Sequence, residues 1–215
     1  MSPLRTALLS LTGALLLLSA AGCKSGPPTI GDPPPRLTDG EAERGYKDVL
    51  GRFTGTGEVY TGFDTQLFAG ATYQSWEFRK ARVERVAQFK SQSKEEVEKL
   101  LAEERAEWEQ FHVFELGTWT REPRFDDFDR KNSIWRIALR TDTVELLPSE
   151  VMRVQRVNQD ARALYPYMGE FWVRYRVMFP RRLPDGSPSL PDGTKDLTLR
   201  VASTLGRADL KTRAE

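Results

Sequence analysis

Apolar and polar side chains alternate along the second half of the chain with the period of two that is typical of a β-strand. The clearest stretch is Glu170–Phe179, which Pro180 closes because proline donates no hydrogen bond to a ladder. Its apolar face consists of Phe171, Val173, Tyr175, Val177 and Phe179. Similar patterns predict strands at Thr54–Tyr60, Gln66–Tyr73, Phe111–Trp119, Ile134–Arg140, Val151–Val157 and Leu197–Ser203.

Turn residues separate these segments. Pro184-Asp185-Gly186 and Pro191-Asp192-Gly193 lie between the last two predicted strands, where proline presets one turn angle and glycine accepts a positive one. Several short strands joined by turns are typical of an antiparallel sandwich or a barrel. We predict a mainly β fold, an antiparallel β-sandwich of the immunoglobulin-like kind, and the pattern leaves the barrel open.

A helical pair interrupts the strands at about residues 78–111. Ser93 and Glu96 have the spacing of a capping box, which marks a helix start. The helix that follows has one apolar face, made of Val97, Leu100, Leu101, Trp108 and Phe111. The segment Lys80–Phe89 is predicted to be a second helix, and we expect the pair to pack on the sheet or cap one of its ends.

The first residues have the layout of an export signal. Arg5 supplies the positive start, Ala7–Leu18 is nearly all apolar, and small residues follow up to Gly22. The apolar run is shorter than the roughly 20 residues of a membrane-spanning helix. This pattern predicts a cleaved signal peptide at residues 1–22.

The small residues end at Cys23, the sole cysteine, and this arrangement resembles the lipobox of bacterial lipoproteins. The match covers residues 1–23 and departs from the usual pattern at Ala20, where leucine is commoner. The resemblance implies cleavage before Cys23, lipid on its thiol and acylation of the new amino group. Lys24 in the next position favours the outer membrane. An ordinary secretory signal cut near Ala21 is the alternative, but it would leave an unpaired thiol in an oxidising compartment.

A spacer rich in proline and glycine follows the cysteine. We assign residues 23–44 to this lipidated tether, because prolines favour extended conformations and the segment offers few large apolar side chains to bury. Residues 45–210 form the predicted folded domain, and residues 211–215 a short tail.

Charge excludes one class of partner. Removing residues 1–22 takes one of the 32 basic residues and no acid, so the mature chain carries 31 of each sign. A neutral total argues against non-specific nucleic-acid binding, which needs a basic surface.

No residue set in the mature chain amounts to a known catalytic site. His112 is the only histidine and has no cysteine partner in the domain, so we predict a structural role at the end of the second helix and no zinc site. Glu104 lies within the apolar stripe of that helix, where a carboxyl group either has a raised pKa or pairs with an arginine.

The loop between residues 121 and 133 is dense in acids, of which Asp126, Asp127 and Asp129 are the candidate calcium ligands. Their spacing does not fit a calcium loop of the EF-hand type, and nearby basic residues neutralise them. We therefore predict a surface loop, no metal site and no cofactor.

A candidate binding face consists of side chains that should point away from the core on their own strands: Arg136, Arg140, Trp172, Arg174, Arg176 and Arg200. Arginine forks match carboxylates and phosphates, so the face would contact an anionic envelope component or an acidic protein partner if the strands are neighbours. Trp172 would serve as a carbohydrate-stacking platform. A solvated surface is the alternative for both.

These features predict a membrane-anchored envelope lipoprotein at the outer membrane, holding a non-enzymatic binding, scaffolding or assembly-accessory domain. Its expected partners are the membrane, through the lipid on Cys23, and an envelope protein. The Arg-rich composition and layout resemble uncharacterised envelope lipoproteins of GC-rich bacteria, and this resemblance implies no activity. The alternative is a hydrolase of envelope polysaccharide or peptidoglycan that uses acids such as Glu104 or Asp129.

Overall fold

The strands form two antiparallel sheets in a computed structural model that describes residues 40–154 and 157–215. All described residues fall within the unit Pro33–Glu215. The first sheet has the order β1-β2-β3-β7-β6. Its strands are β1 (Thr54–Thr61), β2 (Asp64–Tyr73), β3 (Phe111–Thr120), β6 (Glu150–Val154) and β7 (Val173–Pro180).

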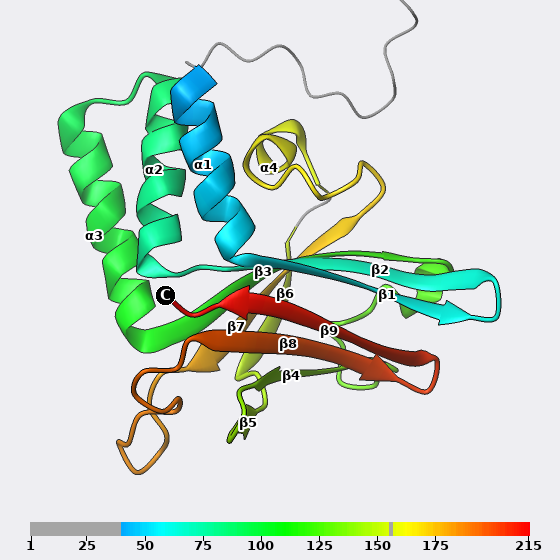
Figure 1. The fold of residues 1–215 in the computed structure, drawn as a ribbon. Coiled ribbons are helices and arrows are strands. Elements are labelled where there is room, and N and C mark those ends of the chain that lie inside the picture. The colour runs from blue at the N-terminus through cyan, green and yellow to red at the C-terminus, as the bar shows by residue number, and fades with distance from the viewer. Residues whose placement is uncertain (1–39, 155–156) are drawn as a thin grey trace, which may run out of the picture. The chain divides into compact units, whose positions relative to one another are not determined.

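The second sheet has the order β5-β4-β8-β9 and lies beneath the first in Figure 1. Its strands are β4 (Arg136–Arg140), β5 (Glu145–Leu146), β8 (Asp196–Ser203) and β9 (Gly206–Arg213). β1 and β9 lie very close together. An added Cβ at Gly55 on β1 would lie only 2.5 Å from the carbonyl oxygen of Lys211 on β9. The two sheets therefore approach each other closely along β1 and β9.

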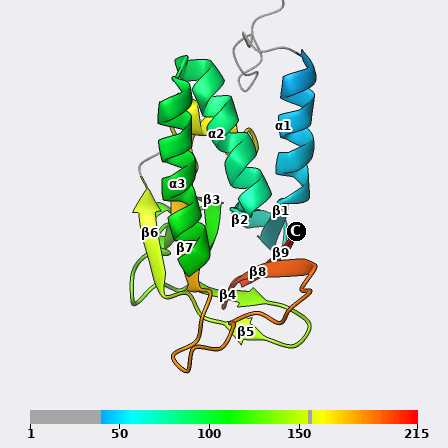
Figure 2. The same cartoon turned by 90° about the vertical axis from the view of Figure 1, so that its left-hand side faces the viewer.

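Helices cover the face of the first sheet that points away from the second, as Figures 1 and 2 show. α1, α2 and α3 run side by side near one end, and α4 lies over the same face. Their bounds are α1 (Gly40–Arg52), α2 (Trp76–Lys90), α3 (Lys94–Gln110) and α4 (Gln159–Leu164), with a 3-10 turn at Pro123–Phe125.

The core lies between the two sheets and under the helices. On β7, Val173, Tyr175, Val177 and Phe179 are all buried, as their alternation predicts. Phe171, assigned to the same face, precedes the strand and is 82% exposed, so that part of the prediction is wrong. Alternation places residues on one face only where the backbone is extended and paired, and β7 begins at Val173.

Helix α1 begins at Gly40, inside the segment that we assigned to the tether. Tyr46 and Leu50 lie one turn apart and are both buried, so this short amphipathic face is anchored in the core. Tyr46 also donates a hydrogen bond to the carbonyl of Leu164, 2.8 Å away. Residues 40–44 therefore belong to the folded domain.

The far end of the chain is a strand and not a tail. β9 runs to Arg213 and pairs with β8, and Leu210 and Thr212 are buried. The turn at Gly206, with a φ of 143°, makes this hairpin.

All seven strands expected from alternation are present in the described residues, with ends that shift by a few residues. The capping box of Ser93 and Glu96 is confirmed, with both reciprocal hydrogen bonds formed. The mainly β arrangement in two antiparallel sheets, with an inserted helical pair, therefore agrees with the prediction. The finer immunoglobulin-like assignment stays a prediction.

Candidate functional site

A cleft of about 410 Å³ opens where α2 begins, α3 ends and the β7–β8 loop passes. That volume is at the small end of the range for ligand pockets. The side chains that line it and bear on its chemistry are Phe53, Tyr73, Trp76, Trp108, His112 and Arg181. The cleft therefore combines aromatic walls with one guanidinium group.

Local structure fixes these side chains on separate elements. Ser75 caps α2 by accepting a hydrogen bond from the amide of Phe78, which sets Trp76 at the first helical position. Trp108 lies in the last turn of α3, and its ring centroid is 6.2 Å from that of Trp76. Arg181 follows directly after β7, and its amide donates to the carbonyl of Gln110 at 2.9 Å.

A hydrogen-bonded chain joins Arg181, Tyr73 and His112. Arg181 Nη2 donates to the Tyr73 hydroxyl at 3.2 Å, because a guanidinium group has no acceptor. The Tyr73 hydroxyl also shares a hydrogen bond with His112 Nδ1, 3.0 Å away, in which the hydroxyl donates when the ring proton is on Nε2. Burial, aided by the charge of Arg181, lowers the pKa of His112 to about 3.

His112 is therefore a neutral, buried ring at physiological pH. It lies on β3, just after the end of α3, with its side chain inside the core. Burial disfavours its charged form, and Arg181 repels a second positive charge nearby.

Arg181 has an unusual environment for a half-buried cation. Its guanidinium carbon lies 4.1 Å from the centroid of the Trp108 ring, and that of Arg105 lies 4.5 Å from the same ring. Its Nε is buried without a hydrogen-bond partner among the described residues. Burial, together with the charges of Arg79 and Arg105, lowers the pKa of Arg181.

Acids also border the cleft, at Glu77, Asp192 and Glu215. Glu77 accepts hydrogen bonds from both terminal nitrogens of Arg52, at 3.1 and 2.5 Å. In the described part of the chain, none of these acids lies within ion-pair distance of Arg181.

A buried ion network lies next to the cleft, between α2, α3 and the first sheet. Arg79 is fully buried, and its Nη1 contacts Glu104 at 2.5 Å and Glu107 at 2.7 Å. Arg82 reaches the other oxygen of Glu104 at 2.6 Å. Burial by itself would raise the pKa of Glu104, but Arg82 and Arg79 outweigh it and lower the pKa. Glu104 therefore takes the arginine-paired role and not that of a general acid with a raised pKa.

The candidate binding face is divided between the two sheets. Arg174 and Arg176 lie on β7 beneath α3, where Arg176 pairs with Glu107 and Arg174 contacts Glu115 at 3.5 Å. Burial raises the pKa of Glu115, and both arginines oppose that shift. These two arginines are partners of the ion network.

The other three arginines lie together on the second sheet. Arg136 and Arg140 are on β4, and Arg200 is on the neighbouring β8 opposite Ala138. Arg140 pairs with Glu145 at 3.0 Å, and Arg200 makes a two-point contact with Asp209 at 2.7 and 2.8 Å. The six predicted residues therefore do not form one face, because residues on different strands become neighbours only where those strands pair.

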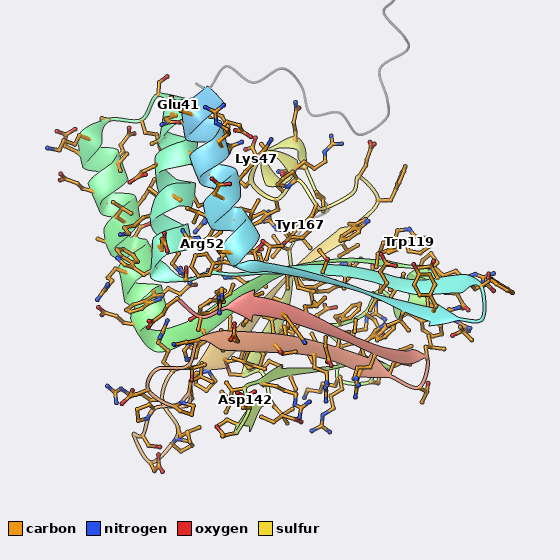
Figure 3. The ribbon with its side chains drawn as sticks, in the orientation of Figure 1. Glu41, Lys47, Arg52, Trp119, Asp142 and Tyr167 are labelled. Carbon is orange, nitrogen blue, oxygen red and sulfur yellow. The ribbon has the colours of Figure 1, made fainter. Side chains whose placement is uncertain are left out.

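Trp172 is half-buried beside two glycines, and an added Cβ at Gly169 or Gly117 would lie 2.8 or 3.1 Å from its ring. The Trp172 side chain packs against the hydrophobic core. Trp119, labelled in Figure 3, is also half-buried on the first sheet, and its ring centroid lies 5.5 Å from that of Phe68.

Hydrogen bonds within the acidic loop and contacts with β6 and β7 hold the loop in place. Asp126 accepts a bond from the Tyr175 hydroxyl at 2.8 Å and pairs with Arg153 at 3.2 Å, while Asp127 accepts from the Ser133 hydroxyl at 2.8 Å. Asp129 is exposed. Residues 40–154 and 157–215 contain no group of three or more His, Cys, Asp or Glu side chains placed to hold a metal ion.

Cys23 and the predicted signal and tether residues up to position 39 lie outside the described residues. Among the helices that are described, none is both long and apolar enough to cross a membrane.

Neither Arg181 nor Trp76 was predicted as a site residue from the sequence. The available signal was an arginine placed directly after a strand-closing proline, at the start of a turn-rich loop.

No family model, curated protein or solved structure matches the chain.

Proposed function

We propose that this protein is a membrane-anchored envelope lipoprotein whose folded domain binds a ligand or protein partner without catalysing a reaction. The observation that carries the proposal is the cleft between α2, α3 and the β7–β8 loop, with the walls Trp76 and Trp108 and the cation Arg181. Small binding sites combine apolar walls with a few placed polar groups in this way.

The state of the ionisable groups favours binding over hydrolysis. His112 is held as a neutral ring whose Nδ1 is hydrogen-bonded to Tyr73. Glu104 is occupied by two arginines, and Asp129 lies on an exposed loop away from the residues that line the cleft. A hydrolase would need one of the acids that border the cleft to be coupled to a general base or a nucleophile, whereas Glu77 is held by both terminal nitrogens of Arg52.

The proposed anchor is lipid on Cys23, and the proposed location is the outer membrane. A lipidated terminus would keep the domain near the membrane while the cleft engages an envelope protein. Two or more acyl chains anchor a protein stably, whereas one holds it only marginally. The neutral charge balance favours a protein partner over nucleic acid, and no cofactor enters the proposal.

The anchor is tested by fractionating cells that express the full chain or its Cys23→Ser variant. We expect the full chain in the membrane pellet, carrying lipid detectable by mass spectrometry, and the variant in the soluble envelope fraction. Recovery of the variant in the pellet at wild-type levels would overturn lipid anchoring.

The binding role is tested by affinity purification of the lipidated chain from its native membrane. Trp76→Ala removes a wall of the cleft, and Trp119→Ala removes a partly exposed tryptophan on the first sheet outside it. We expect the co-purified partner to be lost with the first variant and kept with the second. Equal partner recovery from both would contradict a role for this cleft.

A further inference from the structure

We propose that the cleft recognises a carboxylate group carried on an apolar body, with Arg181 as the residue that binds the carboxylate. This inference rests on the proposed binding function of the same cleft and specifies the class of ligand. It would fit the carboxylate end of an apolar peptide or of a small organic acid.

The charge of Arg181 differs from those of nearby arginines in having no acidic partner in the described residues. Its neighbours on the helix side all have acidic partners: Arg79 and Arg82 pair with Glu104, and Arg176 pairs with Glu107. Arg181 has no carboxylate within ion-pair distance in residues 40–154 and 157–215, and its buried Nε has no acceptor there. Charges withdrawn from water are normally paired, so this one is suited to a partner from outside the domain.

The guanidinium group of Arg181 is held in a fixed position. Trp108 supports it at 4.1 Å, and the Tyr73 hydroxyl accepts from Nη2. Tyr73 is buried and hydrogen-bonded to His112 in turn. A guanidinium group held in this way loses little conformational freedom when it forms a two-point contact with a carboxylate.

The other residues that line the cleft favour one kind of anion over another. Asp192 and Glu215 border the cleft, as does Glu77, which Arg52 neutralises, and these acids repel a singly charged carboxylate less than a doubly charged group such as phosphate. A carboxylate carries one negative charge and matches the single arginine. The remaining walls include Phe53, Trp76 and Leu190, which suit an apolar or aromatic body.

The experiment titrates the full-length lipidated protein in detergent with phenylacetate, phenylacetamide and inorganic phosphate, by calorimetry. We expect phenylacetate to bind at least about tenfold more tightly than phenylacetamide, since the amide cannot form charge-assisted hydrogen bonds with the guanidinium group. Phosphate should bind more weakly than phenylacetate. Equal affinity for acid and amide, or preference for phosphate, would overturn the proposal.

Matched variants locate the effect. Arg181→Gln should weaken phenylacetate binding at least about tenfold. Arg182→Gln changes the adjacent arginine, which is exposed and bonds only its own turn at the carbonyl of Gly186, and should leave binding unchanged. Arg181→Lys keeps the positive charge but loses the two-point hydrogen bonding of the guanidinium group. Its affinity for phenylacetate should therefore lie between those of the wild type and the glutamine variant. If Arg181→Gln binds phenylacetate as tightly as the wild type, Arg181 is not the residue that binds the carboxylate.

Thermal unfolding separates ligand binding from a structural role. Arg181→Gln removes a half-buried charge without a carboxylate partner in the described domain but also loses the contacts with Trp108 and Tyr73, so its unfolding temperature should stay near that of the wild type. Phenylacetate should raise the unfolding temperature of the wild type only. A lowered unfolding temperature with unchanged binding would identify a structural arginine and sink the proposal. If Arg181→Gln does not fold, the comparison of acid with amide on the wild type still decides.

The proposed function can survive the failure of this inference. A partner lost from Trp76→Ala but kept by Arg181→Gln would leave the cleft as a binding site and remove the carboxylate as its target. Two sources of carboxylate are compared with N-acetylphenylalanine, which mimics a peptide end, and glucuronate, an acidic sugar. Tighter binding of the sugar would contradict the apolar body.

Discussion

His112 links the buried chemistry of the cleft to the pH dependence of stability. In the folded protein, burial and Arg181 lower its pKa to about 3, whereas the unfolded chain has the ordinary value of about 6.5. Between these values the unfolded state binds the proton and the folded state does not. Stability is therefore greatest above about pH 6.5 and falls as the pH drops towards about 3, by about 1.4 kcal/mol per pH unit at full slope.

We expect urea unfolding of the wild type to show this loss between pH 6.5 and pH 5, above the range where most carboxylates titrate. His112→Asn should flatten the dependence in that window, whatever its effect on stability at pH 7.5. A slope that is identical in the two proteins would show that the proton is taken up elsewhere.

At the scale of elements, the contacts of α3 with α2 and the first sheet depend on a few charged groups. Glu104 and Glu107 both contact Arg79, whose side chain is fully buried, and Glu107 also contacts Arg176 on β7. Removing both negative charges would leave a buried guanidinium group without a carboxylate partner. We expect the double change Glu104→Gln with Glu107→Gln to lower the free energy of unfolding by about 3 kcal/mol, measured by urea denaturation.

Glu109 on the same helix provides the matched control. It pairs with Arg105 across one turn, and both side chains are largely exposed. Exposed pairs contribute little, so Glu109→Gln should change stability by less than about 0.5 kcal/mol. Similar losses from the control and the double variant would mean that burial of Arg79 does not set the energy of this contact.

The strands were predictable from the sequence because a half-buried strand repeats every two residues, as β7 does from Val173 to Phe179. The capping box of α3 was predictable because it is local. α1 and β9 were not, because the apolar signals of Tyr46, Leu50 and Leu210 are sparse and gain meaning only from the core that they enter. The composition of residues 40–44 also continued that of the preceding spacer.

The site was less predictable than the strands, for a reason that belongs to the whole molecule. The binding face predicted from alternation assumed that its strands were neighbours, yet Arg176 and Arg200 belong to different sheets. The cleft joins α2, α3 and the β7–β8 loop, so Trp76, Trp108 and Arg181 converge only through tertiary structure. Alternation within one strand carries no information on which elements meet.

The approach of the two sheets along β1 and β9 gives a last prediction at this scale. A methyl group at Gly55 would lie 2.5 Å from the oxygen and 2.6 Å from the nitrogen of Lys211, and backbone cannot move aside as a flexible side chain can. Gly55→Ala should therefore push β1 from β9 and lower the free energy of unfolding by about 2 kcal/mol. Gly45→Ala is the control: it lies in α1 with nothing within 4 Å, so it should stabilise by about 0.5–1 kcal/mol. Thermal and urea unfolding measure both, and a neutral Gly55→Ala would mean that the sheets do not depend on this close contact.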